Sequence, residues 1–300
     1  MSVTTLQQFA ARDAGAARAL GRRRSLIDRL VTALCLLATV VGLFFLASIL
    51  ATLLWRGLGA LDWTVLSNEF RPTTYGDDTL QKGGLLHAII GSLIHVGLAT
   101  LIGTPVGLLV GTYLAEYARN SAFGNAVRFV SDILLSAPSI LIGLFIYQLV
   151  VLPMGGFSGF AGVLALAIIV VPVVVRTTED MLQLIPNTLR EAVIALGAPK
   201  WRMIVLVCYK AALSGIVTGV LLAVARIAGE TAPLLLTSFG NNVISTDLGS
   251  AMASLPIAIY QQANSGFPDL IAIAWAGALL VTLGVLAINI VARLLLRRKS

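Results

Sequence analysis

The residues with the clearest chemical potential in this sequence are an arginine and a glutamate inside a strongly apolar segment. Arg226 and Glu230 stand four residues apart in VARIAGETAPLLLT, so on a helix they share one face. A charge facing lipid at such a position is costly, so both side chains must face protein or water. Either the pair neutralises itself or a partner subunit's charge, or Arg226 offers its planar guanidinium to an oxyanion.

The second interpretation gives Glu230 a defined role. It would hold Arg226 while the site is empty, or accept the proton of a hydrogen phosphate. Gly229 and Pro233 are expected to loosen the helix here and to free backbone groups, as happens in the substrate-site helices of transporters.

A second chemical feature is the polar segment PNTLREAVIALGAPKWR, residues 186–202. Thr188 and Glu191 have the spacing of a capping box, which predicts a short helix that ends at Gly197 and Pro199. Its apolar positions, three to four residues apart, are Leu189, Val193 and Leu196. The helix is therefore amphipathic, and it either lies at the membrane interface or docks a soluble partner.

The sequence carries no motif for hydrolysing ATP and none for binding a metal. A P-loop needs a Gly-Lys-Ser/Thr run, and none of the four lysines follows a glycine. His87 and His95 are about 12 Å apart by helical rise and have no cysteine beside them, so packing or pore-lining roles are expected. We therefore predict no catalytic residue and no cofactor bound by this chain.

Composition places these motifs in a membrane protein. The 300 residues are 58% hydrophobic and 12% charged, with a mean hydropathy of +0.93. A bilayer core needs roughly 20 apolar residues per helix. The long uncharged stretch 133–175 is divided at PMGGFSGF, residues 153–160, where a turn is expected. The prediction is an all-α polytopic protein with six spans, at about residues 30–54, 84–114, 129–152, 160–176, 203–228 and 270–293.

The distribution of basic residues predicts the topology. With both termini in the cytoplasm, 17 of the 21 lysines and arginines fall on the cytoplasmic side or at its edge. The net charge of +7 is then a membrane signature and no sign of nucleic-acid binding. We expect a loose or amphipathic cytoplasmic arm (1–29) followed by a membrane domain (30–300). Within that domain we expect a cytoplasmic loop (177–202) and an extracytoplasmic segment with a short helix (237–269).

The cytoplasmic loop resembles a known motif. Glu191, Ala192 and, six positions after the glutamate, Gly197 resemble the EAA loop of the permease subunits of bacterial ABC importers. In that family the loop inserts into a groove of the cytoplasmic ATPase. The chain departs from the family's closing Leu-Pro with Tyr209 and Lys210, which leaves the entry into the fifth span less fixed.

Longer stretches resemble one branch of these importers. The runs LREAVIALGAPKW, ARIAGETAPLLLTSFG and MASLPIAIY are similar to the PstA-type permeases of phosphate ABC importers, from about Gly84 onward. The resemblance implies a type I importer in which a PstC-type permease forms a heterodimer with this chain. Two PstB-type ATPases holding ATP and Mg would lie beneath, and an extracytoplasmic phosphate-binding protein would deliver inorganic phosphate.

The resemblance also implies which residues act. Arg226, Glu230 and Arg176 would lie on the substrate pathway, and Glu191, Ala192 and Gly197 would couple to the ATPase. Arg176, in VPVVVRTTEDML, is equally explained as a positive-inside anchor.

Three other functions fit part of the pattern. Another oxyanion importer, for sulfate, molybdate or phosphonate, would have the same build, because a guanidinium does not choose among these anions. An ion-driven carrier would show broken helices repeated in two halves, which the sequence lacks. A membrane scaffold that reports phosphate status to a kinase is the third.

Overall fold

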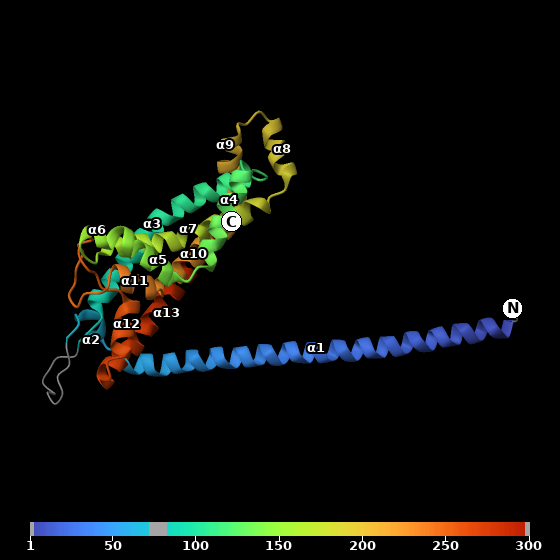
Figure 1. The fold of residues 1–300 in the computed structure, drawn as a ribbon, viewed down its shortest axis with the longest axis horizontal. Coiled ribbons are helices and arrows are strands. Elements are labelled where there is room, and N and C mark those ends of the chain that lie inside the picture. The colour runs from blue at the N-terminus through green and yellow to red at the C-terminus, as the bar shows by residue number, and fades with distance from the viewer. Residues whose placement is uncertain (1–2, 72–82, 298–300) are drawn as a thin grey trace. The chain divides into compact units, whose positions relative to one another are not determined.

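The computed structural model describes residues 3–71 and 83–297, and within them every regular element is helical (Figure 1). The all-α prediction is therefore confirmed. Contacts divide the chain into two compact units, residues 1–55 and 56–300. The first unit consists of the greater part of α1 (Val3–Ala60), a helix whose part Ile27–Ala60 is long and apolar enough to span a membrane. The N-terminal arm, expected to be loose or amphipathic, is helical from Val3 and continuous with this span.

The second unit contains four further helical segments long and apolar enough to span a membrane. They are α3 (Leu86–Glu116), α7 (Gly159–Gln183), the run Lys200–Ala228, and α13 (Pro268–Arg297). The run Lys200–Ala228 joins α9 (Lys200–Met203), the π-helical turn η2 (Ile204–Cys208) and α10 (Tyr209–Ala228). The described residues therefore hold five such segments, or six if a bent helix pair is counted as one span.

The bent pair covers the region where one span is expected, at about residues 129–152. It consists of α4 (Ala122–Ser136) and the helical run Ser139–Met154, which are bent by 104° relative to each other. The break falls at Ala137, which takes an extended conformation before Pro138. The proline ring disfavours helical geometry at the preceding residue, so a local covalent effect interrupts an otherwise uncharged run.

The second half of the bent pair ends at the predicted turn. It consists of α5 (Ser139–Ile146), the π-helical turn η1 (Tyr147–Val151) and α6 (Leu152–Met154). Gly155 follows with φ 76°, a conformation that costs glycine little. The Ser158 side chain then accepts a hydrogen bond from Ala161 N at the start of α7. The turn expected at 153–160 is confirmed.

A row of glycines brings α3 and α7 into close parallel contact. The glycines lie four residues apart, so they form one face of α3. A Cβ placed on Gly107 would lie 2.6 Å from Val174 Cβ, which is closer than real Cβ atoms approach. The contacts pair Gly103 with Val170, Gly107 with Val174, and Gly111 with Thr178. Because the residue numbers of the contacting positions increase in the same direction along both helices, α3 and α7 are parallel and end on the same side.

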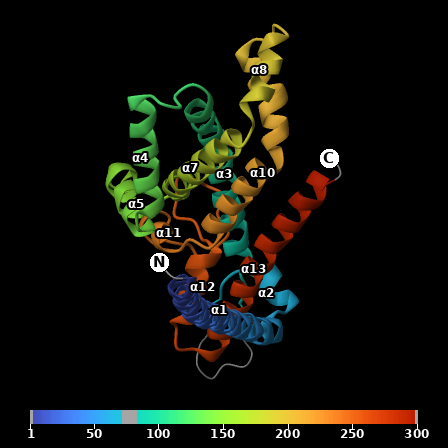
Figure 2. The ribbon, with the colours of Figure 1, turned by 90° about the vertical axis from the view of Figure 1, so that its right-hand side faces the viewer.

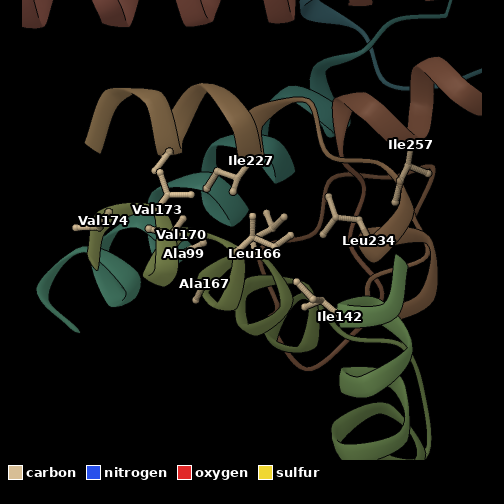
Figure 3. Close-up of a cluster of buried hydrophobic side chains, with 12 residues drawn as sticks. Ala99, Ile142, Leu166, Ala167, Val170, Val173, Val174, Ile227, Leu234 and Ile257 are labelled. Carbon is tan, nitrogen blue, oxygen red and sulfur yellow. The ribbon is translucent and has the colours of Figure 1, made fainter. Parts of the chain in front are cut away.

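A second set of small residues joins α10 to another face of α7. Gly215 packs against Met181 and Gly219 against Thr177, so α10 runs antiparallel to α7. Of the spanning segments in the described residues, α7 is the most deeply buried. Figure 3 shows the core that results, in which Leu166 and Val170 of α7 lie beside Ile227 of α10.

The shorter helices complete the unit. α2 (Trp63–Ser67), α11 (Ala232–Thr237) and α12 (Leu255–Ala263) surround the ends of the long helices. α12 is the short helix expected within 237–269, and its buried Leu255 and Ala258 share a core with Ile273 and Ala276 of α13. α8 (Asn187–Ala195) and α9 lie at the other end of the unit (Figures 1 and 2).

We predict that replacing Gly107 by valine destabilises the protein by about 1–3 kcal/mol or more, because the new side chain collides with Val174. Gly97→Val is the matched control, since it adds the same side chain to the same helix at a position with nothing within 4 Å. Thermal unfolding in detergent measures both variants. Equal shifts of Tm would show that the glycine face does not set the packing.

Candidate functional site

The segment with the resemblance to the EAA loop stands at the end of the second unit where α3 and α7 terminate (Figures 1 and 2). α8 carries Glu191 and Ala192, both exposed, and none of its residues is buried. Gly197 follows the helix with φ 80° and is also exposed. The predicted end of the helix is confirmed, because Gly197 takes the left-handed conformation and Pro199 directly precedes α9.

The predicted start of this helix is wrong in detail. Thr188 is not the N-cap, since α8 begins at Asn187 and the N-cap position is occupied by Pro186. Pro186 makes no side-chain cap bond, but its ring fixes φ at −60° and directs the chain into the helix. Thr188 therefore lies in the first turn, and the capping box does not form.

The apolar face of α8 is only partly covered. Val193 packs against a core cluster that includes Leu182 and Met203. Leu196, in contrast, is 88% exposed, Leu189 is exposed on the same face, and Ile194 is exposed on another face of α8. An apolar surface next to an exposed carboxylate is typical of a surface that contacts another molecule.

Arg226 and Glu230 form an ion pair at the end of α10. The helix ends at Ala228, so Glu230 lies beyond it and not on the helix as the sequence suggested. Arg226 Nε is still 3.8 Å from Glu230 Oε1, and the two side chains are 38% and 17% exposed. Gly229 is the C-cap and Pro233 opens α11, which confirms the expected interruption. The long, partly exposed pair leaves the guanidinium accessible.

Arg226 lies on an exposed polar stripe of α10. The exposed positions on this face fall four residues apart: Lys210, Ser214, Thr218, Leu222 and Arg226. Polar and charged groups on a membrane-spanning helix face protein or water in preference to lipid. This face of α10 therefore fits a partner subunit or an aqueous pathway.

Arg176 does not join the Arg226 pair. It forms its own half-exposed ion pair with Asp180, with 3.4 Å between Nε and Oδ2. Since its neighbour Thr177 packs on Gly219, Arg176 lies near the level of Val220, and Arg226 is roughly 9 Å further along α10 by helical rise. Among the described residues, Arg176 forms no ion pair with Glu230 and Arg226 forms none with Asp180.

The two histidines take packing positions. Both are buried, and the Nδ1 atom of His95 lies 2.7 Å from Gly91 O of its own helix. Its ring packs against Gly162 of α7. The residues that the structure describes contain no group of three side chains that could hold a metal ion.

Sequence reasoning missed a group of four charged residues at the ends of α3 and α7, which we call the charged cluster. Arg128 of α4 pairs with Glu179 of α7, and Arg190 of α8 pairs with Glu116 of α3, each at 2.7 Å. The two carboxylates are only 3% and 4% exposed. The available signal was four charges at the borders of apolar runs, but nothing in the sequence assigned their partners.

The arginines of the charged cluster also donate hydrogen bonds to backbone carbonyl groups at the helix ends. Arg128 Nη2 donates to Leu114 O at 3.1 Å near the end of α3, and Arg190 Nη2 donates to Leu182 O at 2.7 Å near the end of α7. Each arginine thus caps one helix of the parallel pair and forms an ion pair with the other. The hydrogen bond with Glu116 raises the pKa of Arg190, so its charge is permanent.

Comparisons with known proteins match this architecture. Residues 103–300 match the family described as "Binding-protein-dependent transport system inner membrane component". The chain is 53% identical to the phosphate transport system permease protein PstA of Pasteurella multocida, covering 92% of this chain and 97% of that protein. It is 52% identical to PstA of Haemophilus influenzae (91% and 95%) and 35% identical to PstA 1 of Mycobacterium tuberculosis H37Rv (93% and 90%).

Solved structures show the same fold at low sequence identity. A structure of the inward-facing MetNI methionine ABC transporter aligns with a TM-score of 0.57 and 20% identity, covering 72% of this chain and 94% of that chain. A bacterial ABC transporter that imports alginate aligns with a TM-score of 0.57 and 16% identity, covering 85% and 95%.

Fold and sequence together define the class: this is a multi-pass inner membrane component with the type I ABC importer permease fold. Within that class the chain belongs to the PstA family of permeases. The expectation of a transport subunit, with no enzymatic activity of its own, is confirmed by this membership.

The buried pair of Arg128 and Glu179 should matter far more for stability than the exposed pair of Arg176 and Asp180. Arg128→Met leaves the Glu179 carboxylate buried without its cation, so we expect a loss of about 3–5 kcal/mol in the free energy of unfolding. Arg176→Met, the matched control, should cost less than about 1 kcal/mol. Denaturant titration in mixed micelles measures both, and equal losses would contradict the assignment.

Proposed function

We propose that this chain is the transmembrane permease subunit of an ATP-driven inorganic phosphate importer. It would form half of the translocation pathway and couple to a cytoplasmic ATPase through the helix that carries Glu191. The observation that carries the proposal is the relation to the PstA permeases, which extends over more than nine-tenths of the chain.

The chemistry of the Arg226 pair supports an anionic substrate. A guanidinium binds phosphate oxygens through two parallel hydrogen bonds, and Arg226 is held only loosely by Glu230. Phosphate would displace Glu230 from this long ion pair and bind the Arg226 guanidinium in its place. Glu230 lies beside the site, where it would accept the proton of a hydrogen phosphate. Arg176, at a different level along α7, would act elsewhere on the pathway or only anchor α7.

The exposed end of α8 supports a docking role. Glu191, Ala192 and Gly197 lie on a segment that projects beyond the ends of the spanning helices, and Leu196 offers an uncovered apolar side chain. An interfacial helix would usually face the membrane with this side. Because α8 lies at the tip of a projecting helical pair, we favour its docking into a groove of a soluble protein over its lying at the membrane interface.

The partners follow from the proposed role. A PstC-type permease would complete the pathway as a heterodimer, and two PstB-type ATPases would bind ATP and Mg, so this chain itself would bind no cofactor. A soluble phosphate-binding protein would dock on the extracytoplasmic side, at residues 55–83 and 243–268; of these, 72–82 lie outside the described residues. Both termini and α8 would face the cytoplasm, in agreement with the distribution of basic residues.

The proposed cycle moves α8 as a rigid lever. Binding of ATP closes the two ATPases, the α8 helices follow them, and the pathway changes from inward-facing to outward-facing. Hydrolysis then resets it. The chain contributes no bond-breaking step. Its whole contribution is that it binds phosphate and the ATPase differently in the inward-facing and outward-facing states.

We expect Arg226→Gln to reduce phosphate uptake at least about tenfold in proteoliposomes holding the complete transporter, since charge-assisted hydrogen bonds contribute roughly 1.5–3 kcal/mol each. Arg293→Gln, an exposed arginine in α13, is the control. Competition by sulfate, molybdate and phosphonate in the same assay tests selectivity. Stronger competition by one of these than by unlabelled phosphate would make that anion the substrate.

We expect Glu191→Lys to leave membrane insertion intact but to separate ATP hydrolysis from uptake, because the reversed charge disrupts the contact with the ATPase. Gly197→Asp should act similarly, since a side chain at φ 80° strains the turn. Asp28→Lys, the same charge change at an exposed site in α1, is the control. Normal phosphate uptake in the Glu191 and Gly197 variants would refute the coupling role. Uptake by this chain alone would indicate a secondary carrier.

A further inference from the structure

Arg190 directly precedes Glu191 in α8, yet its side chain is only 11% exposed and packs against the body of the protein. Its Nη2 donates to Glu116 Oε1 at 2.7 Å and to Leu182 O at 2.7 Å. Its Nη1 donates to Ile185 O, and its Nε lies 3.2 Å from Glu116 Oε1. One guanidinium therefore joins the start of α8 to the last residue of α3 and to the end of α7.

A second contact fastens the other end of the same segment. Lys200, the first residue of α9, donates from Nζ to Glu116 O, and its ammonium group lies 4.2 Å from the centre of the Tyr117 ring. Arg190 and Lys200 thus hold the segment between α7 and α10 at two points. Both points meet at Glu116, the last residue of α3.

The contacts of Arg190 resist separation. The Glu116 side chain is 4% exposed, so pulling Arg190 away would leave a carboxylate buried without its cation. The carbonyl group of Ile185 would lose the Arg190 donor in the same movement, and the carbonyl group of Leu182 would keep only the N–H of Ile185. A displacement of α8 must therefore carry the ends of α3 and α7 with it.

We propose that Arg190 and Glu116 are positioning residues that transmit the displacement of α8 to the membrane-spanning helices. The inference rests on the proposed function, in which an ATPase moves α8. From α7 the displacement reaches α10 through the close contacts at Gly215 and Gly219, and α10 carries Arg226 at its far end. The Arg190 side chain is bound to α3 and α7 and not offered at the exposed surface of α8, so we expect its effect in the coupling between ATP hydrolysis and phosphate uptake.

The test uses the complete transporter in proteoliposomes and measures phosphate uptake and ATP hydrolysis on the same sample. Arg190→Gln and Glu116→Gln should each keep the ATPase bound and active, while phosphate transported per ATP falls roughly twofold to thirtyfold. The double variant should be no worse than the more affected single variant, because both remove one interaction. Arg190→Lys keeps the positive charge but loses the planar set of guanidinium donors. Its ratio of phosphate transported to ATP hydrolysed should therefore lie between those of wild type and Arg190→Gln.

The matched control is Arg202→Gln. Arg202 lies in α9 of the same segment, but it is exposed and stacks at 5.3 Å over its neighbour Trp201. It should keep the wild-type ratio of phosphate to ATP. A wild-type ratio in both Arg190→Gln and Glu116→Gln would overturn the inference. The inference would also be overturned if the variants lowered only the protein yield, while the folded transporter kept the wild-type ratio of phosphate to ATP. The pair would then contribute to stability alone.

The Glu191→Lys variant, measured beside the others, separates this inference from the proposed function. If Glu191→Lys is uncoupled while the Arg190 and Glu116 variants remain fully coupled, only the transmission role fails. If Glu191→Lys is fully coupled, the docking role of α8 fails, whatever the other variants show.

Discussion

The close contact between the glycine face of α3 and the valine and threonine face of α7 is the constraint on which the rest of the second unit depends. No side chain fits between Gly107 and Val174, so the helices approach to backbone distance along a parallel register. In a membrane there is little hydrophobic gain in joining apolar helices, and close packing of small residues supplies the stability instead. The same device, repeated at Gly215 and Gly219, adds α10.

Parallel packing has an electrostatic consequence at the ends of the helices. The free carbonyls and the negative dipole ends of α3 and α7 come together on one side, where they favour cations. Arg128 and Arg190 meet that requirement, and Glu179 and Glu116 in turn balance the two arginines. The charged cluster follows from the packing of the spans, and it fixes α8 at the place where α8 leaves the membrane domain.

Much of this protein is determined by the sequence alone, because the signals are local. Apolar runs longer than a bilayer core require helices, and paired glycines at 155–156 required the turn before α7. Gly197 and Pro199 ended α8 where the backbone rules predict. The chemistry of the arginine pair was also visible, since a charge in an apolar run must find a partner or water. Each inference needs only neighbours within a few residues.

The tertiary structure alone decided which distant residues meet. Glu116 and Arg190 are 74 positions apart, and only the parallel contact of α3 with α7 brings the end of α3 beside α8. Arg176 and Arg226 looked alike as basic pathway residues, but the antiparallel register of α7 and α10 places them at different levels. Partner choice and depth are set by the packing of several helices at once, and no segment of the chain encodes that packing by itself.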